Sequence, residues 1–237
     1  MAIGYDSLPM LFQTVLDTPM YEGVGTLAHD IARPPNVTEE HTMLLQGAAA
    51  WAQWPLSNIS IISFDAANPD RLALSAANSL SMDYMVGSFS GVAWVFLDVI
   101  AATARSIFFK GGNGVACGWD FLVTATGELL FSTVQAGDSQ HTYSPAGTIV
   151  ISTWALVGWS RLGAAAKVYK NGVNVTSLPG AHVNPDTAAA RDLHIGVTDG
   201  HALPFDGYMW RPRIWSRQLS GIEMSELFAM EKAYFGV

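Results

Sequence analysis

Acidic residues are the first group whose spacing could support catalysis, because two carboxylates placed across a glycosidic bond can hydrolyse it. Successive side chains of a β-strand alternate between its faces, so a pair on one strand must occupy alternate positions. None of the twenty Asp and Glu residues has an acidic neighbour two positions away. Glu39 and Glu40 are adjacent, and Glu223 and Glu226 are three apart. We therefore expect no catalytic pair within one strand, while a pair drawn from two strands stays open.

Motifs for other nucleophiles and for phosphates are present only in part. Gly87-Ser-Phe-Ser-Gly lacks a serine at the central position that a nucleophile elbow requires, and a strand-like run follows it. Gly111-Gly-Asn-Gly precedes no predicted helix, so it does not indicate a phosphate-binding loop. The six His residues show no metal-ligand spacing. We predict no catalytic residues and expect that the protein is not an enzyme.

Composition limits the class of protein. Of 237 residues, 50% are hydrophobic and 14% are charged, against about 25% charged in an average soluble domain. This composition excludes a disordered tail and a coiled coil. The net charge of −8 argues against nucleic-acid binding, which depends on neutralising phosphates with cations. The many aromatic residues predict a large core, or an apolar surface reserved for partners.

Compartment signals are few. The single cysteine, Cys117, excludes an intramolecular disulfide. The N-terminal segment has no cationic region and contains Asp6, so it does not resemble a signal peptide. The most apolar stretch, residues 91–104, contains Asp98 and is too short to span a bilayer. We expect no signal peptide and no membrane insertion.

Hydrophobic residues recur mostly with a period of two, which is typical of β-strands. Residues 89–97 are apolar at every other position on both faces, which predicts a central strand covered on both sides. Residues 79–84 alternate and are also expected to form a strand. Lys170-Asn-Gly-Val predicts a hairpin, because Asn-Gly supplies the positive φ angles of a type I′ turn. Short strands at this spacing indicate a sandwich or jelly roll.

One helix is expected near the C-terminus. Ser220-Gly-Ile-Glu has the pattern of a capping box, in which Ser220 and Glu223 each bind the backbone N–H of the other. Ile222, Leu227 and Met230 would form its apolar face.

Several segments carry a family likeness. The fullest is Phe205-Asp-Gly-Tyr-Met-Trp-Arg-Pro-Arg-Ile-Trp-Ser-Arg-Gln-Leu-Ser, which leads into the capped helix. The others, in chain order, are Thr18–Asp30, Ile62–Leu74, Ser88–Val95 and the hairpin Val168-Tyr-Lys-Asn-Gly. Together they span about residues 15–235, and they resemble the laminin-G-like and concanavalin A-like jelly-roll family.

The resemblance implies an all-β fold: a two-sheet antiparallel β-sandwich, or jelly roll, with one short C-terminal α-helix. We expect one laminin-G-like domain at residues 16–237, preceded by an N-terminal arm at residues 1–15. Because this fold hosts lectins, glycosidases, adhesion modules and virion proteins, it does not by itself name an activity.

The same resemblance indicates where a metal would bind. Jelly rolls of this type often hold calcium near an Asp that follows the first strand and an Asp in the closing strand. Asp30 matches the first position, and Asp206 and Asp199 could contribute, but the closing strand lacks its Asp. Calcium takes about six to eight oxygen ligands. We therefore expect no cofactor, with calcium at these three residues as the alternative.

A glycan is the other ligand that the resemblance suggests. We predict contacts from Trp210, Arg211, His201 and Asn113. Trp210 stands where the family usually has a polar residue, so we expect an exposed ring that could stack on a sugar.

Three functions remain. The first is a non-catalytic structural or adhesive protein of a phage-like virion, such as a capsid decoration, fibre or spike. Such a protein would form homo-oligomers or bind capsid or tail proteins. It would be found in the virion, or outside the cell after lysis. The second is a carbohydrate-binding, lectin-like module. The third is a glycoside hydrolase. We favour the first because subunit interfaces bury apolar surface and because particle release by lysis needs no export signal.

Overall fold

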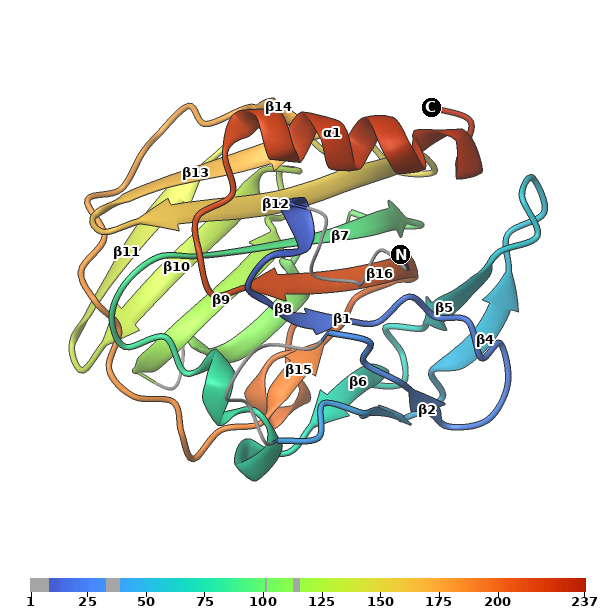
Figure 1. Ribbon diagram of the computed structural model, residues 1–237, viewed down its shortest axis with the longest axis horizontal. Coiled ribbons are helices and arrows are strands. Elements are labelled where there is room, and N and C mark those ends of the chain that lie inside the picture. The colour runs from blue at the N-terminus through green and yellow to red at the C-terminus, as the bar shows by residue number, and fades with distance from the viewer. Residues whose placement is uncertain (1–8, 33–38, 101, 113–115) are drawn as a thin grey trace, which may run out of the picture.

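The computed structural model describes residues 9–32, 39–100, 102–112 and 116–237, whose strands form two sheets (Figure 1). Sheet A consists of β1 (Thr14–Asp17), β4 (Ala50–Gln53), β5 (Ser60–Phe64), β7 (Phe89–Leu97), β12 (Trp154–Leu162), β13 (Ala165–Lys170), β14 (Val173–Asn174) and β16 (Gly207–Trp215). Sheet B consists of β2 (Leu27–Ala28), β3 (Met43–Gln46), β6 (Arg71–Leu74), β8 (Arg105–Gly112), β9 (Cys117–Val123), β10 (Leu129–Gln135), β11 (Asp138–Tyr143) and β15 (Leu193–Ile195).

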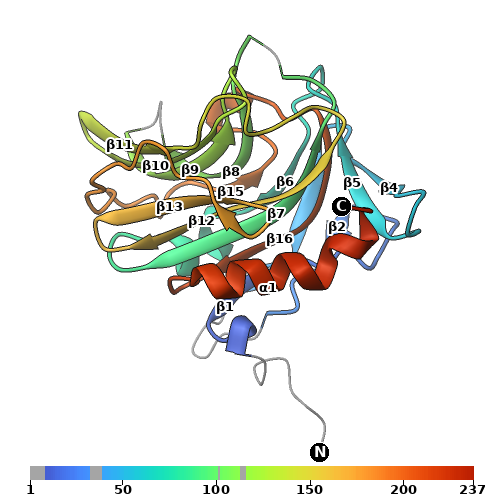
Figure 2. The ribbon, with the colours of Figure 1, turned by 90° about the horizontal axis from the view of Figure 1, so that it is seen from above.

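The strand order defines an antiparallel sandwich. Sheet A runs β14-β13-β12-β7-β16-β5-β4, with β1 also pairing with β16, and sheet B runs β11-β10-β9-β8-β15-β6-β3-β2. Figure 2 shows the two sheets stacked, with α1 (Gly221–Glu231) along the outer face of sheet A. Short 3₁₀ turns complete the structure: η2 (Pro9–Leu11), η3 (Ala76–Asn78), η4 (Leu80–Met82), η5 (Asp199–His201) and η6 (Lys232–Tyr234). The predicted fold class is confirmed.

Two local signals form the structures that they predict. Asn171 and Gly172 both have positive φ and connect β13 to β14, as a type I′ hairpin requires. The Ser220 side chain accepts from the Glu223 N–H, and Glu223 returns a bond to the Ser220 N–H, which completes the capping box. Among the described residues, no helix is long and apolar enough to cross a membrane.

Strand β7 is buried on both faces, as its pattern predicts. Its inner face meets sheet B, and its outer face is covered by α1 and the residues that follow it. Trp94, on the outer face, packs against Phe228 and Phe235 at ring-centre distances of 5.8 and 4.4 Å. The helix is therefore required to keep the outer face of sheet A out of water.

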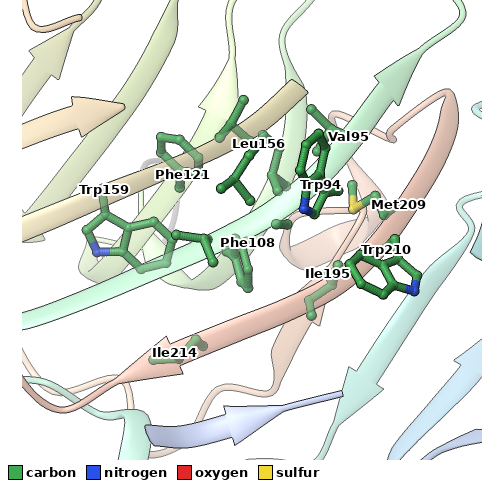
Figure 3. Packing of buried hydrophobic residues seen from close by; sticks show 14 of the residues in the cluster. Trp94, Val95, Phe108, Phe121, Leu156, Trp159, Ile195, Met209, Trp210 and Ile214 are labelled. Atoms are coloured by element: carbon green, nitrogen blue, oxygen red, sulfur yellow. The ribbon is translucent and has the colours of Figure 1, made fainter. Parts of the chain in front are cut away.

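Between the sheets, the fully buried ring of Trp159 packs among other aromatic side chains of the core (Figure 3). The rings of Phe108 and Phe121, from sheet B, pack against it with ring-centre distances of 5.2 Å each. In the register of sheet A, Trp159 lies opposite Gly91, and a Cβ at Gly91 would come within 2.1 Å of the indole. Position 91 therefore needs a glycine, because the Trp159 ring occupies the space that a side chain at this position would fill.

The strand expected at residues 79–84 is wrong: this segment forms η4 and adjoining turns. Serine side chains bind the local backbone here. Ser75 caps η3 by accepting from the Asn78 N–H, and the Ser79 hydroxyl donates to the Ser75 carbonyl at 2.9 Å. Such bonds compete with a sheet ladder, while Met82 and Tyr84 still reach the core.

The structure also revises the N-terminal boundary. Thr14 and Val15 lie in β1, which pairs with β16, and Leu11 is buried. Trp215 donates from its indole N–H to the Met10 carbonyl at 2.7 Å. The boundary expected after residue 15 therefore falls inside β1, and residues 10–15 belong to the sandwich. The rest of the predicted arm, residues 1–8, lies outside the described residues.

His182 is a buried polar side chain that ties a long loop to sheet B. Its ring nitrogens contact the hydroxyls of Thr133 and Thr142, each at 2.8 Å. Burial, and then the charges of Arg161 and His141, lower the pKa of His182 from 6.5 to about 4. The imidazole is therefore neutral at pH 7. If it were protonated, its charge would be buried away from water.

This gives a pH-dependent stability. Because the folded state binds the proton less readily than the unfolded state, stability is complete above about pH 6.5 and falls as the pH drops toward about 4. The loss assigned to His182 is roughly 3 kcal/mol. We predict that His182→Gln makes the free energy of unfolding in urea depend less on pH between pH 6.5 and 4. His201→Gln, at an exposed histidine, should leave this pH dependence as in the native protein. An unchanged pH dependence in His182→Gln would contradict this assignment.

Candidate functional site

A hollow of about 280 Å³ opens where β16, the turn before β5 and the C-terminal segment meet. We call it the Trp210 hollow. It is lined by Pro19, Met20, Tyr21, Asn58, Ile59, Ser60, Trp210, Arg211 and Tyr234. Its volume lies close to the lower end of the usual range for small-molecule sites, about 300–1,000 Å³. Two of the residues predicted to contact a glycan, Trp210 and Arg211, are thus brought together here.

Trp210 forms the floor of this hollow and is not the exposed platform that the sequence predicted. Only 5% of the residue is exposed. Its ring packs edge-on against Tyr234 at 5.7 Å and Phe235 at 5.6 Å. The residues after α1 fold back over the tryptophan, so a ligand would meet the edges of the hollow before its floor. Figure 3 shows Trp210 on β16, at the margin of the core.

Arg211 enters the hollow because β16 is irregular at this point. The register with β7 shifts between Trp210 and Arg213, and Arg211 has a φ of +49°. A bulge of this kind re-aims a side chain, at a cost in backbone strain. The strain is offset by the ion pairs that Arg211 makes.

Those ion pairs involve two acidic residues. The guanidinium binds both Asp17 oxygens at 3.0 Å and donates to Glu231 at 3.0 Å. Burial alone would lower the pKa of Arg211, but the hydrogen bonds and charges of Asp17 and Glu231 raise it above the ordinary value. Glu231 also accepts from Arg213 at 2.7 Å and from the Trp94 indole at 2.8 Å. Arg211 is therefore a fixed cation at one wall of the hollow.

The accessible part of the hollow is formed by residues that the sequence did not single out. Tyr21 is 74% exposed and Tyr234 is 43% exposed. Asn58 and Ser60 add hydrogen-bonding side chains from the turn before β5 and from β5 itself. These residues come from three distant segments, so no local spacing could have indicated them.

His201, another predicted glycan contact, does not line the hollow. It is exposed in η5, with a φ of +62°. Asn113 lies outside the described residues. Of the three predicted contacts that the structure describes, Trp210 and Arg211 share the hollow and His201 lies outside it.

The three candidate calcium ligands are also kept apart by their own contacts. Asp30 accepts from the backbone N–H groups of Asp17 and Ala32 and contacts His41. Asp199 pairs with Arg191 at 2.5 Å. Within the described ranges, no three His, Cys, Asp or Glu side chains gather as metal ligands would. The expected calcium site is not assembled from these residues.

Asp206 instead lies beside Asp98, at the adjoining ends of β16 and β7. The Asp98 N–H donates to the Asp206 carbonyl at 3.0 Å. Partial burial and the charge of Asp206 raise the pKa of Asp98. Asp98 directly follows β7 and Asp206 directly precedes β16, so two strands bring this pair of acids together. Neither residue lines the Trp210 hollow.

A second, wider hollow of about 590 Å³ lies along β13 and the segment that follows β14. Its lining is Ala164, Ala165, Ala166, Lys167, Asn174, Thr176, Pro179, Gly180 and Ala181. It contains no aromatic side chain and few converging polar groups, so the Trp210 hollow is the better candidate for a specific ligand.

The described strands define a two-sheet jelly-roll sandwich, and the Trp210 hollow is its candidate ligand site. A family model described as the concanavalin A-like lectin/glucanases superfamily matches residues 70–225. The chain belongs to this superfamily. No curated protein sequence matches it.

Solved structures with this fold include binding domains of botulinum neurotoxins. That of serotype C1 has a TM-score of 0.66 at 11% identity, over 93% of this chain and 53% of its own. That of neurotoxin DC, in complex with rat synaptotagmin II, has a TM-score of 0.60 at 11% identity, over 93% and 52%. A type C structure, concerning cell entry dependent upon two ganglioside molecules, has a TM-score of 0.59 at 12% identity, over 94% and 52%. The chain thus spans about half the length of these proteins, and the likeness shows the fold.

The Arg211 ion pairs give a stability prediction. Asp17 is fully buried, and Arg211→Ala would remove the guanidinium that binds both oxygens of its carboxylate. We expect unfolding free energy to fall by about 3–5 kcal/mol, measured by urea denaturation. Arg191→Ala, which breaks the exposed pair with Asp199, is expected to cost less than about 1 kcal/mol. Equal losses in the two variants would contradict this ranking.

Proposed function

We propose that the protein is a carbohydrate-binding, lectin-like module that recognises a glycan in the Trp210 hollow. The observation that carries the proposal is the pairing of two exposed tyrosine rings, Tyr21 and Tyr234, with the fixed cation Arg211 and the polar side chains of Asn58 and Ser60. Aromatic rings with polar tips contact the apolar faces of a ligand. Polar side chains in the same hollow then bind its hydroxyl or acidic groups and set its orientation.

The hollow supports binding and not glycoside hydrolysis. Its described lining contains no Asp or Glu, whereas glycosidases of the usual kind need two carboxylates across the scissile bond. The charge of Arg211 is already balanced by Asp17 and Glu231, so this side chain favours a glycan whose hydroxyl groups accept hydrogen bonds over one that carries a carboxylate. The relatedness of the fold to toxin domains that contact gangliosides and synaptotagmin supports a role in binding at a surface.

The proposal predicts a loss of affinity at the tyrosines. On a glycan array followed by titration calorimetry, we expect a glycan to bind the native protein. Tyr21→Ala and Tyr234→Ala should each raise Kd about tenfold, because each removes an aromatic contact. Phe12→Ala removes an exposed aromatic ring outside the hollow and should leave Kd unchanged.

Chelation by EDTA should not change this binding, because no carboxylate is available at the described lining to hold calcium. Native affinity in both tyrosine variants, or the absence of any glycan ligand, would refute the proposed site.

Assembly into a virion is a second candidate function, and the exposed apolar surface favours it. Ile222, Met230 and Val237 are exposed at 73%, 58% and 42%, and they come from the segment that covers sheet A. A surface of this kind is typical of subunit interfaces. In this role the protein would form a homo-oligomer or bind capsid or tail proteins, and it would be found in the virion or outside the cell after lysis.

Light scattering tests assembly directly. We expect the purified protein to be larger than the 25.4 kDa monomer, and Ile222→Ser with Met230→Ser to reduce that mass without changing glycan affinity. A monomer at all concentrations would exclude self-assembly.

A further inference from the structure

A chain of hydrogen bonds joins a serine, a histidine and an aspartate on the sheet B side of the N-terminal region. The Ser81 hydroxyl lies 3.0 Å from Nε2 of His41, and Nδ1 of His41 lies 3.1 Å from Oδ2 of Asp30. This is the order nucleophile, base and orienting acid. We propose that Ser81, His41 and Asp30 form an acyl-transfer site that cleaves esters, an activity beyond glycan binding and beyond the expectation of a non-catalytic protein.

The contacts determine the direction of each hydrogen bond. Oδ1 of Asp30 accepts from the backbone N–H groups of Asp17 at 2.7 Å and Ala32 at 2.8 Å. These donors mark Asp30 as a carboxylate, which only accepts hydrogen bonds. In the neutral imidazole, Nδ1 of His41 then carries the proton and donates to Asp30, which leaves Nε2 as the acceptor for the Ser81 hydroxyl. This is the tautomer that a general base needs.

Burial separates the roles of the three residues. The His41 and Asp30 side chains are 2% and 8% exposed, so water does not compete strongly for the bond between them. Ser81 is only partly buried, so a substrate can reach its hydroxyl. The exposed apolar side chains of Leu80, Met85 and Val86 lie within five residues of it, which favours an ester with an apolar acyl group.

Ser81 is held on a well-anchored segment. Lys110, whose side chain is buried, donates to the Ser79 hydroxyl at 2.7 Å and to the Arg191 carbonyl at 2.5 Å. The Ala76 N–H donates to Asp192 at 2.7 Å. These contacts fix the turn that carries Ser81 against sheet B, as a positioned nucleophile requires.

The step balances with the substrate and water alone. Ser81 Oγ forms a bond to the ester carbonyl carbon while its proton passes to His41 Nε2. The C–O bond to the alcohol breaks, and the alcohol leaves with that proton. Water then adds to the acyl carbon with His41 as base, and the carboxylic acid leaves as Ser81 regains its proton.

The chain supplies its own comparison. Ser139 lies 3.0 Å from Nε2 of His141, whose Nδ1 lies 3.1 Å from the Ser132 hydroxyl. The Ser–His distances match those at Ser81, but a hydroxyl replaces the carboxylate. Without a carboxylate to define the tautomer, this second pair is expected to be inactive.

The test is covalent labelling with a fluorophosphonate probe, together with hydrolysis of p-nitrophenyl butyrate. We expect one adduct, mapped by mass spectrometry to Ser81, and its complete loss in Ser81→Ala. His41→Gln should slow labelling about 100-fold or more, because the general base is removed. Ser139→Ala should label like the native protein.

Asp30 acts through His41, so its test needs a readout besides rate. In Asp30→Asn, the ¹⁵N NMR signals of His41 should report a change of tautomer from Nδ1–H, while labelling slows and far-UV circular dichroism is retained. No adduct, an adduct at another serine, or native labelling in His41→Gln would overturn the proposal. Because Ser81 is partly exposed and the change to Ala is small, Ser81→Ala decides the matter even if Asp30→Asn does not fold. Glycan binding is measured separately, and its failure has no bearing on the labelling result.

Discussion

The ion pairs between Arg211 and the buried acids Asp17 and Glu231 hold the N-terminal strand of the sandwich against its C-terminal elements. They join β1, near the start of the described chain, to β16 and α1, which are close to each other near its end. A carboxylate without water is tolerated only when charges and hydrogen bonds replace its hydration. Displacing any of the three elements would leave a charge unpaired, so the cluster favours one arrangement of strand, bulge and helix.

Both candidate sites depend on that arrangement. Arg211 forms one wall of the Trp210 hollow because Asp17 and Glu231 hold it across the bulge of β16. The backbone N–H of the same Asp17 donates to Asp30 and fixes the carboxylate that orients His41. One buried residue thus positions a ligand-binding surface with its side chain and a proposed catalytic relay with its main chain. The two sites differ in chemistry, since the hollow has aromatic rings and a cation while the relay has a nucleophile and a base.

Sequence patterns predicted the features that arise within a few residues. The Asn171–Gly172 turn, the capping box at Ser220 and the doubly buried strand β7 all follow from local backbone preference or from periodicity. Prediction was wrong where a distant group, or side-chain bonds to the backbone, decided the outcome. Trp210 was expected to be exposed, but the residues after α1 cover it. Residues 79–84 alternate like a strand, yet serine–backbone bonds and Lys110 hold them as turns.

The sequence by itself determined the class of fold and the absence of an acidic pair on one strand, because a period of two and side-chain alternation are properties of a single chain segment. It also showed a charge-poor composition. Only the tertiary structure decided which residues meet. Tyr21 and Tyr234 are over two hundred positions apart, and Asp30, His41 and Ser81 come from three segments that adjoin only after the strands pair. Strand register and helix packing set such contacts, and both are determined by the burial of the whole core rather than by any local pattern.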